Sequence, residues 1–590
     1  MRRRHDMPFG AQLAESGEAR FNLWAPGTGS VQLLLGGEEH PMQPAPDGLF
    51  TLTAPARPGD RYSFRIGSQE VPDPASRYQP EDVHGPSQLV DPEAFEWRDG
   101  DWRGRPWEET VLYELHVGTF TPEGTFAGVR ERLDYLAGLG VTAIELMPLS
   151  DFPGGRNWGY DGVLPFAPES RYGTPEELKE LVQAAHERGL MVFLDVVYNH
   201  FGPEGNYLHL YAPQFFTDRH RTPWGAAINF DGELSGWVRG FFIHNALYWL
   251  EEYHLDGLRL DAVHAIADGS EKHFLIELAE RVRRRFDSER HVHLVLENDA
   301  NEARYLGRGR YDAQWNDDLH HALHVTVTGE SGGYYADYAD DAIGHLGRCL
   351  AEGFAYQGEP SAYRGGVSRG EPSAGLPPVC FVSFLQNHDQ VGNRAFGERI
   401  TELGAPEAVR AAAAIYLLAP QIPMIFMGEE WSTEQPFPFF CDFGPELARA
   451  VTEGRREEFA RFPEFSDPEM REKIPDPNDP ETFRSAVLEP ERNGRPELYR
   501  ELLRLRREEI APRLRGISGG AAEYRRIGER GLRVRWALGD GSTLTLLANL
   551  GPEPARGFGR PEGEPLYSTV RGMEDAMPPW SVAWYLEGVG

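Results

Sequence analysis

Acidic side chains follow several short apolar runs of the chain, at the points where β-strands would end. Asp261 lies near the end of the fourth such run and Glu297 near the end of the fifth, and Asp389 closes the seventh. Cleavage of a glycosidic bond needs one carboxylic acid to protonate the leaving oxygen and one carboxylate to receive the sugar carbon. These three residues are therefore the candidate catalytic groups, and the chemistry that they predict is glycoside cleavage.

The spacing of the first two carboxylates is that of one strand–helix–strand unit. Asp261 and Glu297 lie 36 residues apart, which places them on adjacent strands. A retaining glycosidase holds its two carboxyl groups about 5–5.5 Å apart, a separation that neighbouring strands can supply. Arg259 faces the same side of its strand as Asp261 and would keep that aspartate ionised. Glu297 must instead be protonated to act as the acid, which requires a pKa raised by burial and by nearby negative charge.

The elements that must position these residues read as a barrel. From Thr110 onward, apolar runs alternate with amphipathic helices, as in parallel βαβ units. Eight runs predict a closed (β/α)8 barrel of the TIM type, whose active site forms at the carboxyl ends of the strands. The runs are Val111–Phe120, Val141–Leu149, Leu190–His200, Gly257–His264, Val292–Asp299, Tyr311–Asp317, Val379–Asp389 and Ile422–Glu430.

Two β-rich segments flank the barrel region. Residues 1–100 alternate short β-type runs with Gly and Pro turns, which predicts an N-terminal β-sandwich of the carbohydrate-binding type. Residues 101–515 form the catalytic barrel in this interpretation, with a loop insertion at about 199–239, and residues 516–590 form a C-terminal all-β domain. After the eighth strand we expect only a loop-rich stretch before the helix Glu497–Glu509.

The bulk properties limit the partners. A net charge of −33 repels polyphosphates, so nucleic acid is not an expected partner, whereas a neutral sugar meets no such repulsion. Three widely spaced cysteines argue against a disulfide framework and favour a reducing compartment. We find no secretory signal and no run of 18 apolar residues, so no membrane association is expected and the predicted location is cytoplasmic. The chemistry requires no cofactor, and no metal-ligand cluster stands out.

Four motifs in chain order resemble the conserved regions of the α-amylase family of glycoside hydrolases. They surround Asp195–His200, Arg259–Asp261, Glu297 and His388–Asp389. A lone acid at a strand end is more often a helix cap or a salt-bridge partner, and for Asp195 the alternative of a supporting role in the barrel stays open. The resemblance implies that Asp261 is the nucleophile, Glu297 the general acid/base and Asp389 the stabiliser of the transition state. It further implies that the residues around the cleaved sugar are Tyr160, His200, Arg259 and His388.

Further stretches resemble one branch of that family, the maltooligosyltrehalose trehalohydrolases. Among them are Asp261-Ala-Val-His-Ala-Ile-Ala-Asp, Gln386-Asn-His-Asp-Gln-Val-Gly-Asn-Arg and Ile425-Phe-Met-Gly-Glu-Glu-Trp. The resemblance implies hydrolysis of the α-1,4 bond next to a terminal trehalose, with maltooligosyltrehalose and related α-glucan oligosaccharides as substrates. One departure is Asn298, where members often carry a small residue.

Recognition of trehalose would need hydroxyl ligands on the leaving side of the cleaved bond. The loops after the fourth and seventh strands offer His264, Asp268, Gln390 and Asn393, and Trp224 offers a stacking platform. Alternatively, these four polar residues cap helices or form hydrogen bonds within the loops, and Trp224 is a core residue. Two other functions also stay open: a glycogen-branching or debranching enzyme, and a non-catalytic glucan-binding or transporter-associated barrel.

Overall fold

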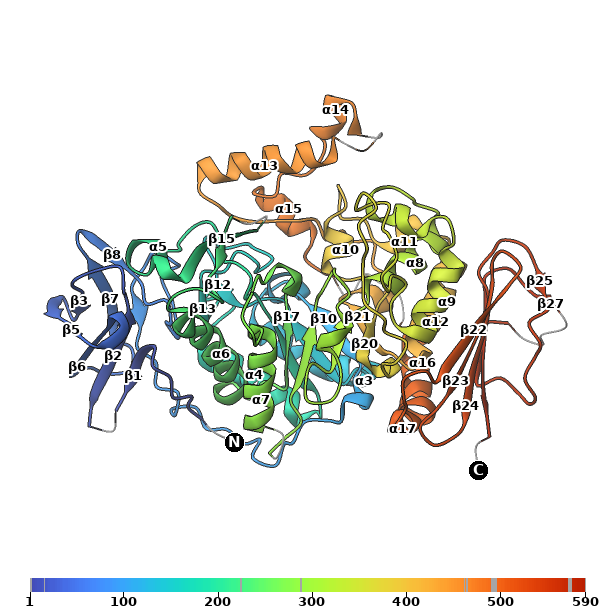
Figure 1. Cartoon of the computed structure of the whole chain (residues 1–590), viewed down its shortest axis with the longest axis horizontal. Coiled ribbons are helices and arrows are strands. Elements are labelled where there is room, and N and C mark those ends of the chain that lie inside the picture. Colours follow the sequence, from blue (N-terminus) through green and yellow to red (C-terminus); the bar gives the residue numbers. More distant parts are fainter. Residues whose placement is uncertain are drawn as a thin grey trace.

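The computed structural model describes residues 3–14, 16–222, 225–286, 289–460, 462, 465–489, 496–570 and 576–588. A central barrel lies between two β-sheet regions, one formed by the start of the chain and one by its end (Figure 1). The middle of the chain thus builds the barrel, and the flanking sheets lie at its sides rather than over its mouth.

Eight parallel strands close the barrel, which confirms the fold expected from the sequence. They are β10 (Leu112–Leu115), β11 (Ala143–Leu146), β14 (Met191–Val196), β17 (Gly257–Leu260), β18 (His293–Leu296), β19 (Ala313–Trp315), β20 (Phe381–Ser383) and β21 (Ile422–Phe426). Each strand is shorter than the apolar run expected for it, because the run continues into the buried segment that follows the strand in the sequence. His388 and Asp389, for example, begin the short helix α10 (His388–Gly392) rather than end a strand.

The barrel interior changes from apolar to polar along β14. On β14 the inward positions alternate with outward ones, so Phe193 and Asp195 point to the same side. Phe193 fills the floor, and a Cβ on Gly257 of the neighbouring strand would come within 2.2 Å of its ring. Asp195, one step nearer the mouth, is buried among charged partners. This gradient places an apolar floor beneath a polar site.

Helices cover the outside of the barrel. The longer ones are α4 (Pro175–Glu187), α6 (Ser235–Glu252), α7 (Phe274–Phe286), α8 (Asp317–Thr328), α9 (Ala342–Glu352), α12 (Pro406–Leu418) and α16 (Glu497–Leu505). Thr174 and Glu177 form a reciprocal capping box at the start of α4, which satisfies two backbone amides that have no partner inside the helix. The segment expected as a loop at 199–239 contains the hairpin β15 (Phe216–Thr222) and β16 (Gly225–Ile228), and α6 already begins at Ser235.

Antiparallel sheets form both ends of the chain. The N-terminal region pairs β1 (Gly10–Leu13), β2 (Glu18–Trp24), β6 (Leu49–Pro55) and β5 (Gln43–Pro44) in one sheet and β4 (Glu38–Pro41), β3 (Gln32–Leu35), β7 (Arg61–Ile66) and β8 (Gln69–Val71) in a second. The C-terminal sheet holds β22 (Ala522–Ile527), β23 (Gly531–Ala537), β24 (Thr543–Asn549), β28 (Ser581–Glu587) and β26 (Tyr567–Ser568). Domain limits at 100/101 and 515/516 stay a prediction.

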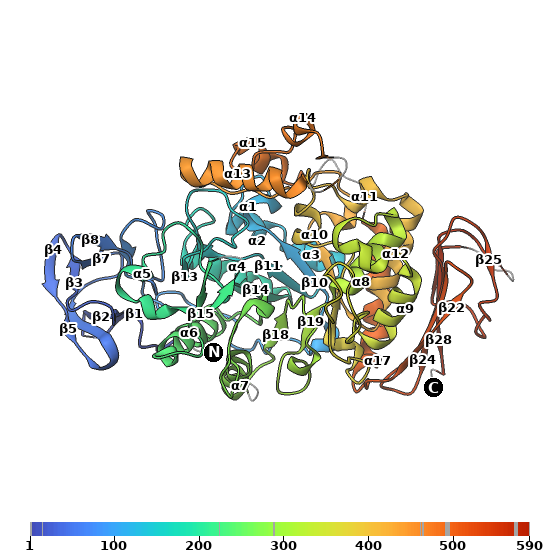
Figure 2. The ribbon, with the colours of Figure 1, turned by 45° about the horizontal axis from the view of Figure 1, so that its top comes forward.

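A helical arm follows β21 and lies above the mouth of the barrel (Figures 1 and 2). It consists of α13 (Pro445–Phe459), α14 (Pro468–Arg471) and α15 (Pro480–Ser485). The sequence indicated only a loop-rich stretch here. Each of the three helices starts with a proline, at the first helical position where a missing amide hydrogen costs nothing.

Three properties bear on the environment of the protein. Among the described residues, no helix is both long and apolar enough to cross a membrane. The three cysteines, Cys349, Cys380 and Cys441, are buried free thiols. Within the same described ranges, no group of three or more His, Cys, Asp or Glu side chains is arranged to hold a metal ion.

The C-terminal sheet is attached to the barrel helices through Trp536 of β23. Its indole is fully buried, stacks on Trp584 at 5.6 Å and donates a hydrogen bond of 3.1 Å to the Leu350 carbonyl at the end of α9. We expect Trp536→Ala to lower the free energy of unfolding by about 3–5 kcal/mol, because it leaves a large cavity. Trp536→Phe keeps most of the volume and should cost clearly less. Urea unfolding followed by far-UV circular dichroism measures both, and equal losses would contradict the packing role.

Candidate active site

The register of two adjacent strands brings Asp261 and Glu297 together. In the pairing of β17 with β18, Leu260 lies opposite Leu296, and the two acids follow directly after these partners. The amide of Glu297 donates to the carbonyl of Leu260 at 2.9 Å, which continues the strand pairing to the acids themselves. The spacing of 36 residues in the sequence therefore becomes a pair of neighbouring carboxyl groups at the barrel mouth.

A buried arginine joins two of the carboxylates from below. Nη1 of Arg259 lies 2.6 Å from Oδ2 of Asp195 and 2.8 Å from Oδ1 of Asp261, and its guanidinium lies 4.0 Å from the ring centre of Trp315. Burial raises the pKa of Asp195 to about 7, although Arg259 acts to lower it. Asp195 also accepts the Tyr160 hydroxyl at 2.5 Å, so it supports the site from beneath.

The environment of Glu297 favours its protonated form. Burial raises the pKa of Glu297 well above its usual value; Arg259 opposes that shift, while Asp261, Asp317 and Asp389 reinforce it. The Ala262 amide donates to Oε2 of Glu297 at 2.6 Å. Ala262 has a φ of +39°, a left-handed conformation that turns the chain immediately after Asp261 and directs this amide at the glutamate.

The third carboxylate stands on helix α10, across the mouth from the other two. The Asn387 side chain caps this helix by accepting the Gln390 amide at 2.8 Å. Nδ1 of His388 lies 2.5 Å from Oε1 of Glu114 at the end of β10, and its Nε2 lies 3.5 Å from Oδ1 of Asp389. Burial acts to lower the pKa of His388, but Asp389 and Glu114 outweigh it and raise that pKa to about 9. A charged imidazole therefore lies beside Asp389 at neutral pH.

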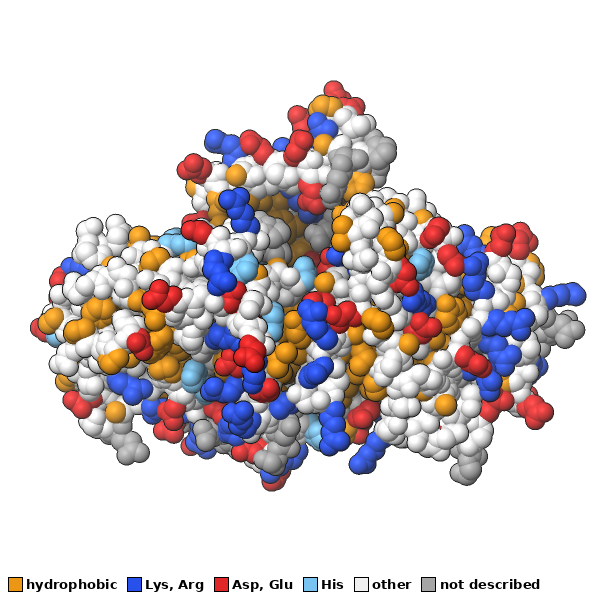
Figure 3. All heavy atoms as spheres, in the orientation of Figure 1, with side chains coloured by type: hydrophobic (Ala, Val, Ile, Leu, Met, Phe, Trp, Pro, Cys, Tyr) orange, Lys and Arg blue, Asp and Glu red, His pale blue; other side chains and the backbone are white. Residues whose placement is uncertain are grey.

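These side chains line one cavity of about 640 Å³. Figure 3 shows the hollow between the barrel and the helical arm. The walls come from the segments after six barrel strands and from the arm. The lining residues are Trp158, Tyr160, Asp161, His200, Asp261, Ala262, His264, Glu297, Asp299, His388, Asp389, Asn393, Phe439, Val451, Gly454, Arg455 and Glu458.

Most of the residues expected in the site lie in or beside this cavity. Tyr160 stacks on His388 with 5.0 Å between the ring centres, and Nε2 of His200 lies 3.0 Å from the Tyr160 carbonyl. His264 lines the cavity and accepts the Asp299 amide at 3.3 Å, and Asn393 donates to Asp389 at 3.3 Å. The structure thus brings together the residues expected around the cleaved sugar and two of the four expected leaving-side ligands.

The other expected leaving-side ligands lie elsewhere. Asp268 is turned away from the cavity: its buried carboxylate pairs with Arg239 at 2.8 Å and accepts the Phe274 amide at the start of α7. It acts as a cap and ion-pair partner, the alternative that the sequence left open. Gln390 is not among the residues that line the cavity, and its amide donates to Asp317 at 3.4 Å. Trp224 lies outside the described residues.

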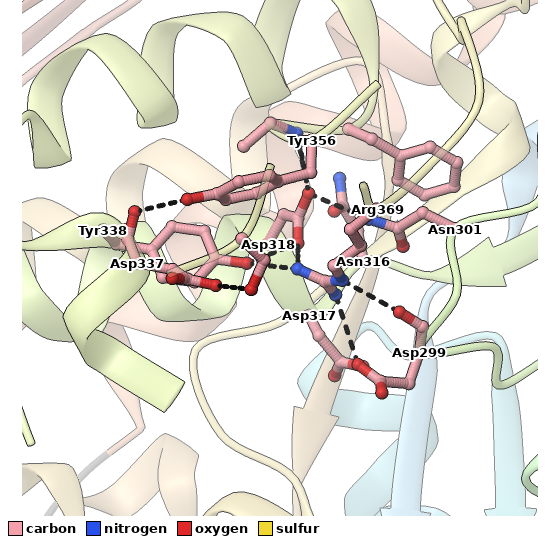
Figure 4. A network of polar contacts seen from close by, with 12 residues as sticks. Asp299, Asn301, Asn316, Asp317, Asp318, Asp337, Tyr338, Tyr356 and Arg369 are labelled. Atoms are coloured by element: carbon pink, nitrogen blue, oxygen red, sulfur yellow. Dashed lines mark hydrogen bonds and ion pairs between the residues drawn. The ribbon is translucent and has the colours of Figure 1, made fainter. Parts of the chain in front are cut away.

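A polar network behind Glu297 contains two site residues that the sequence did not single out. Asp299 follows Glu297 by two positions, and Asp317 begins α8 (Figure 4). Arg369 links the two segments, because it donates to the Asp299 carbonyl at 2.9 Å and to Asp318 at 2.6 Å. Asp317 could have been found with the same strand-end rule, since it follows β19 by two residues.

The departure at Asn298 has a local structural role. Its buried side chain accepts the Ala300 amide at 3.0 Å and donates to Glu302 at 3.2 Å. It closes the turn that follows Glu297 and does not line the cavity.

Comparisons with known proteins agree with this geometry. Residues 89–214 match the family model described as alpha amylase, catalytic domain, and residues 519–584 match one described as a domain of unknown function. The closed eight-stranded barrel and the match to this catalytic-domain model together define the class of the chain, which is a glycoside hydrolase of the α-amylase family. The malto-oligosyltrehalose trehalohydrolase of Saccharolobus solfataricus is 47% identical over 77% of this chain and 80% of its own length, and that of Deinococcus radiodurans is 44% identical over 83% and 81%. The chain belongs to the malto-oligosyltrehalose trehalohydrolase family.

Solved structures show the same fold. A structure titled a putative alpha amylase from Salmonella typhimurium aligns over 98% of this chain and 100% of its own with a TM-score of 0.94 and 44% identity. A pullulanase from Paenibacillus barengoltzii aligns over 99% and 95% with a TM-score of 0.69 and 21% identity, a likeness of fold alone.

Asp317 provides a test of the electrostatics around Glu297. Asp317→Asn removes a negative charge that raises the pKa of Glu297, so this pKa should fall and the acid should deprotonate at lower pH. The basic limb of the pH profile of kcat/KM should therefore move to lower pH by about half to one unit. Asp134→Asn on the outer helix α3 (Leu133–Leu139) is the control and should leave the profile unchanged. An unshifted basic limb in the Asp317 variant would contradict the assignment.

Proposed function

We propose that this chain hydrolyses the α-1,4 bond next to the terminal trehalose of maltooligosyltrehalose and releases trehalose and a maltooligosaccharide. The observation that carries the proposal is the neighbouring pair Asp261 and Glu297, one beside a buried guanidinium and the other with a raised pKa. The names of relatives that align over most of the chain support the choice of substrate. A branching enzyme from Bacillus caldolyticus aligns over only 43% of this chain, which favours trehalose release over branching.

In the first step Glu297 acts as the acid. It gives its proton to the glycosidic oxygen while an oxygen of Asp261 forms a bond with C1 of the sugar. The bond between C1 and the glycosidic oxygen breaks, its electron pair stays on that oxygen, and trehalose leaves as a neutral alcohol. Because the Ala262 amide occupies Oε2 of Glu297, the proton belongs on Oε1.

In the second step Glu297 acts as the base. The carboxylate takes a proton from a water molecule, whose oxygen bonds to C1 while the ester bond to Asp261 breaks. The oligosaccharide leaves with its α configuration retained, and both carboxyl groups return to their starting states. Arg259 pairs with Asp261 at 2.8 Å and holds its carboxylate in position at the start and at the end of the cycle.

The remaining cavity residues would bind the sugar that is cleaved. Asp389, next to the charged His388, would bind ring hydroxyls and stabilise positive charge that develops at C1. Tyr160 offers a ring face held in place by Asp195 and His388. On the leaving side we retain His264 and Asn393 as hydroxyl ligands. The three buried thiols fit the reducing cytoplasm as the site of action.

The two catalytic roles are separable with a substrate whose leaving group needs no proton. Glu297→Gln should lower kcat on oligosaccharides by about 10²–10⁴-fold, because general acid catalysis is lost. The same variant should cleave α-maltosyl fluoride far better than oligosaccharides, since fluoride leaves unprotonated. Asp261→Asn should fail on both substrates. Cleavage is measured as reducing sugar released from the oligosaccharide and as fluoride ion released from the fluoride. Equal losses of activity in Glu297→Gln on both substrates would contradict the assignment of Glu297 as the general acid.

The identity of the products tests the substrate. Incubation with maltotriosyltrehalose should give trehalose and maltotriose, and proton NMR at early times should show the new reducing end as the α anomer. Branched glucan is the competing substrate. Release of side chains from branched glucan without any trehalose from the capped oligosaccharide would show that the chain is a debranching enzyme instead.

A further inference from the structure

Helix α13 presents one face to the active-site cavity. Its lining residues Val451, Gly454, Arg455 and Glu458 are spaced three, four and seven residues from the first, the spacing of a single helical face. The opposite wall of the same cavity holds Asp261, Glu297 and Asp389. The helix therefore lies over the carboxylates as a roof, and a sugar chain bound in the cavity would pass between the helix and the carboxylates.

The roof is attached at the start of α13. Asp442, three residues before the helix, pairs with Arg156 at 2.5 Å and accepts the Gly155 amide at 2.9 Å. The Gly444 amide donates to Glu204 at 3.2 Å. These contacts join the helix to the loops that follow β11 and β14.

The middle and the end of α13 are attached to the segment that carries Asp389. Nη2 of Arg455 donates to the carbonyls of Gly392 and Arg394 at 2.7 and 3.0 Å, and its guanidinium lies 5.7 Å from the ring centre of Phe439. Phe459 packs in an apolar cluster with Ala395 and Phe465. With contacts at both ends, the roof is preformed and its height above the carboxylates is fixed.

Gly454 keeps the centre of this roof open. Glycine inside a helix costs about 1 kcal/mol relative to alanine. A Cβ built on Gly454 meets no atom within 4 Å, so packing within the chain does not require glycine at this position. Because glycine has no side chain, free volume remains on the cavity face of the helix, where a sugar ring would lie against the backbone.

We propose that the inner face of α13 determines specificity by admitting a single unbranched α-glucan chain, with Gly454 as the position that leaves room for a sugar ring. A branch at a ring beneath the roof would have to occupy the space of Val451 or Arg455. This inference rests on the proposed glycoside hydrolysis at Asp261 and Glu297, and it adds the class of chain that the site accepts.

A series at position 454 tests the roof. Gly454→Ala, Gly454→Leu and Gly454→Trp add increasing volume toward the cavity, and kcat/KM for maltotriosyltrehalose should fall in that order, by more than tenfold for leucine. The loss should lie mainly in KM, because the carboxylates are untouched. Melting temperatures should stay equal or rise, since each substitution removes a helix glycine. Glu453→Leu adds the same side chain on the opposite face of α13 and should leave kcat/KM unchanged.

The outcomes separate the roof from the proposed function. Unchanged kcat/KM in Gly454→Leu, or an equal loss in Glu453→Leu, would overturn the inference. If the unmodified protein released no trehalose, the proposed substrate would fail; the same series would then be measured with maltohexaose, where loss of activity in order of side-chain size would still support the roof. Activity of the unmodified protein on branched dextrin equal to that on the linear chain would exclude a roof that selects unbranched chains.

Discussion

The site depends on one buried cation. Arg259 is fully enclosed in the barrel, and it contacts both Asp195 and Asp261 while its plane faces Trp315. Two carboxylates that close to each other would repel strongly in so poorly solvated a place, and removal of one partner from a buried ion pair typically costs about 3–5 kcal/mol. The guanidinium allows negative charge to collect at the mouth. Burial is the main cause of the raised pKa of Glu297, and this negative charge adds to it, although Arg259 itself acts to lower that pKa.

The sequence predicted the elements best where a physical rule links position to chemistry. Strand ends in a parallel barrel meet at one rim, so the order of Asp261, Glu297 and Asp389 sufficed to place them together. No such rule covers Asp268, which lies in a loop after β17, and its carboxylate pairs with Arg239 of α6 instead of lining the cavity. The strand-end rule would also have found Asp317, which follows β19 by two residues and whose charge helps to raise the pKa of Glu297.

The arm above the barrel was beyond prediction for a different reason. Helix α13 has few buried residues, and its inward face carries a glycine, an arginine and a glutamate rather than an apolar stripe. Together with Val451 these residues make a mixed face, which borders a space for sugar instead of a packed core and therefore does not indicate where the helix lies. The strands are shorter than expected because burial does not end where strand pairing ends. Apolar residues continue beyond the last hydrogen bond between strands, into α1 (Val117–Phe120) and into the turn before α10.

The burial of all three native cysteines has a practical consequence. No thiol of the unmodified chain is exposed to a bulky reagent, because Cys349, Cys380 and Cys441 all lie inside the protein. A cysteine introduced on the outer face of α13, as in Glu453→Cys, would then be the single thiol open to a maleimide dye and would leave the cavity face of the helix unchanged. Fluorescence from that dye would report changes around the helix when a ligand binds beneath it, without alteration of Asp261, Glu297 or Asp389.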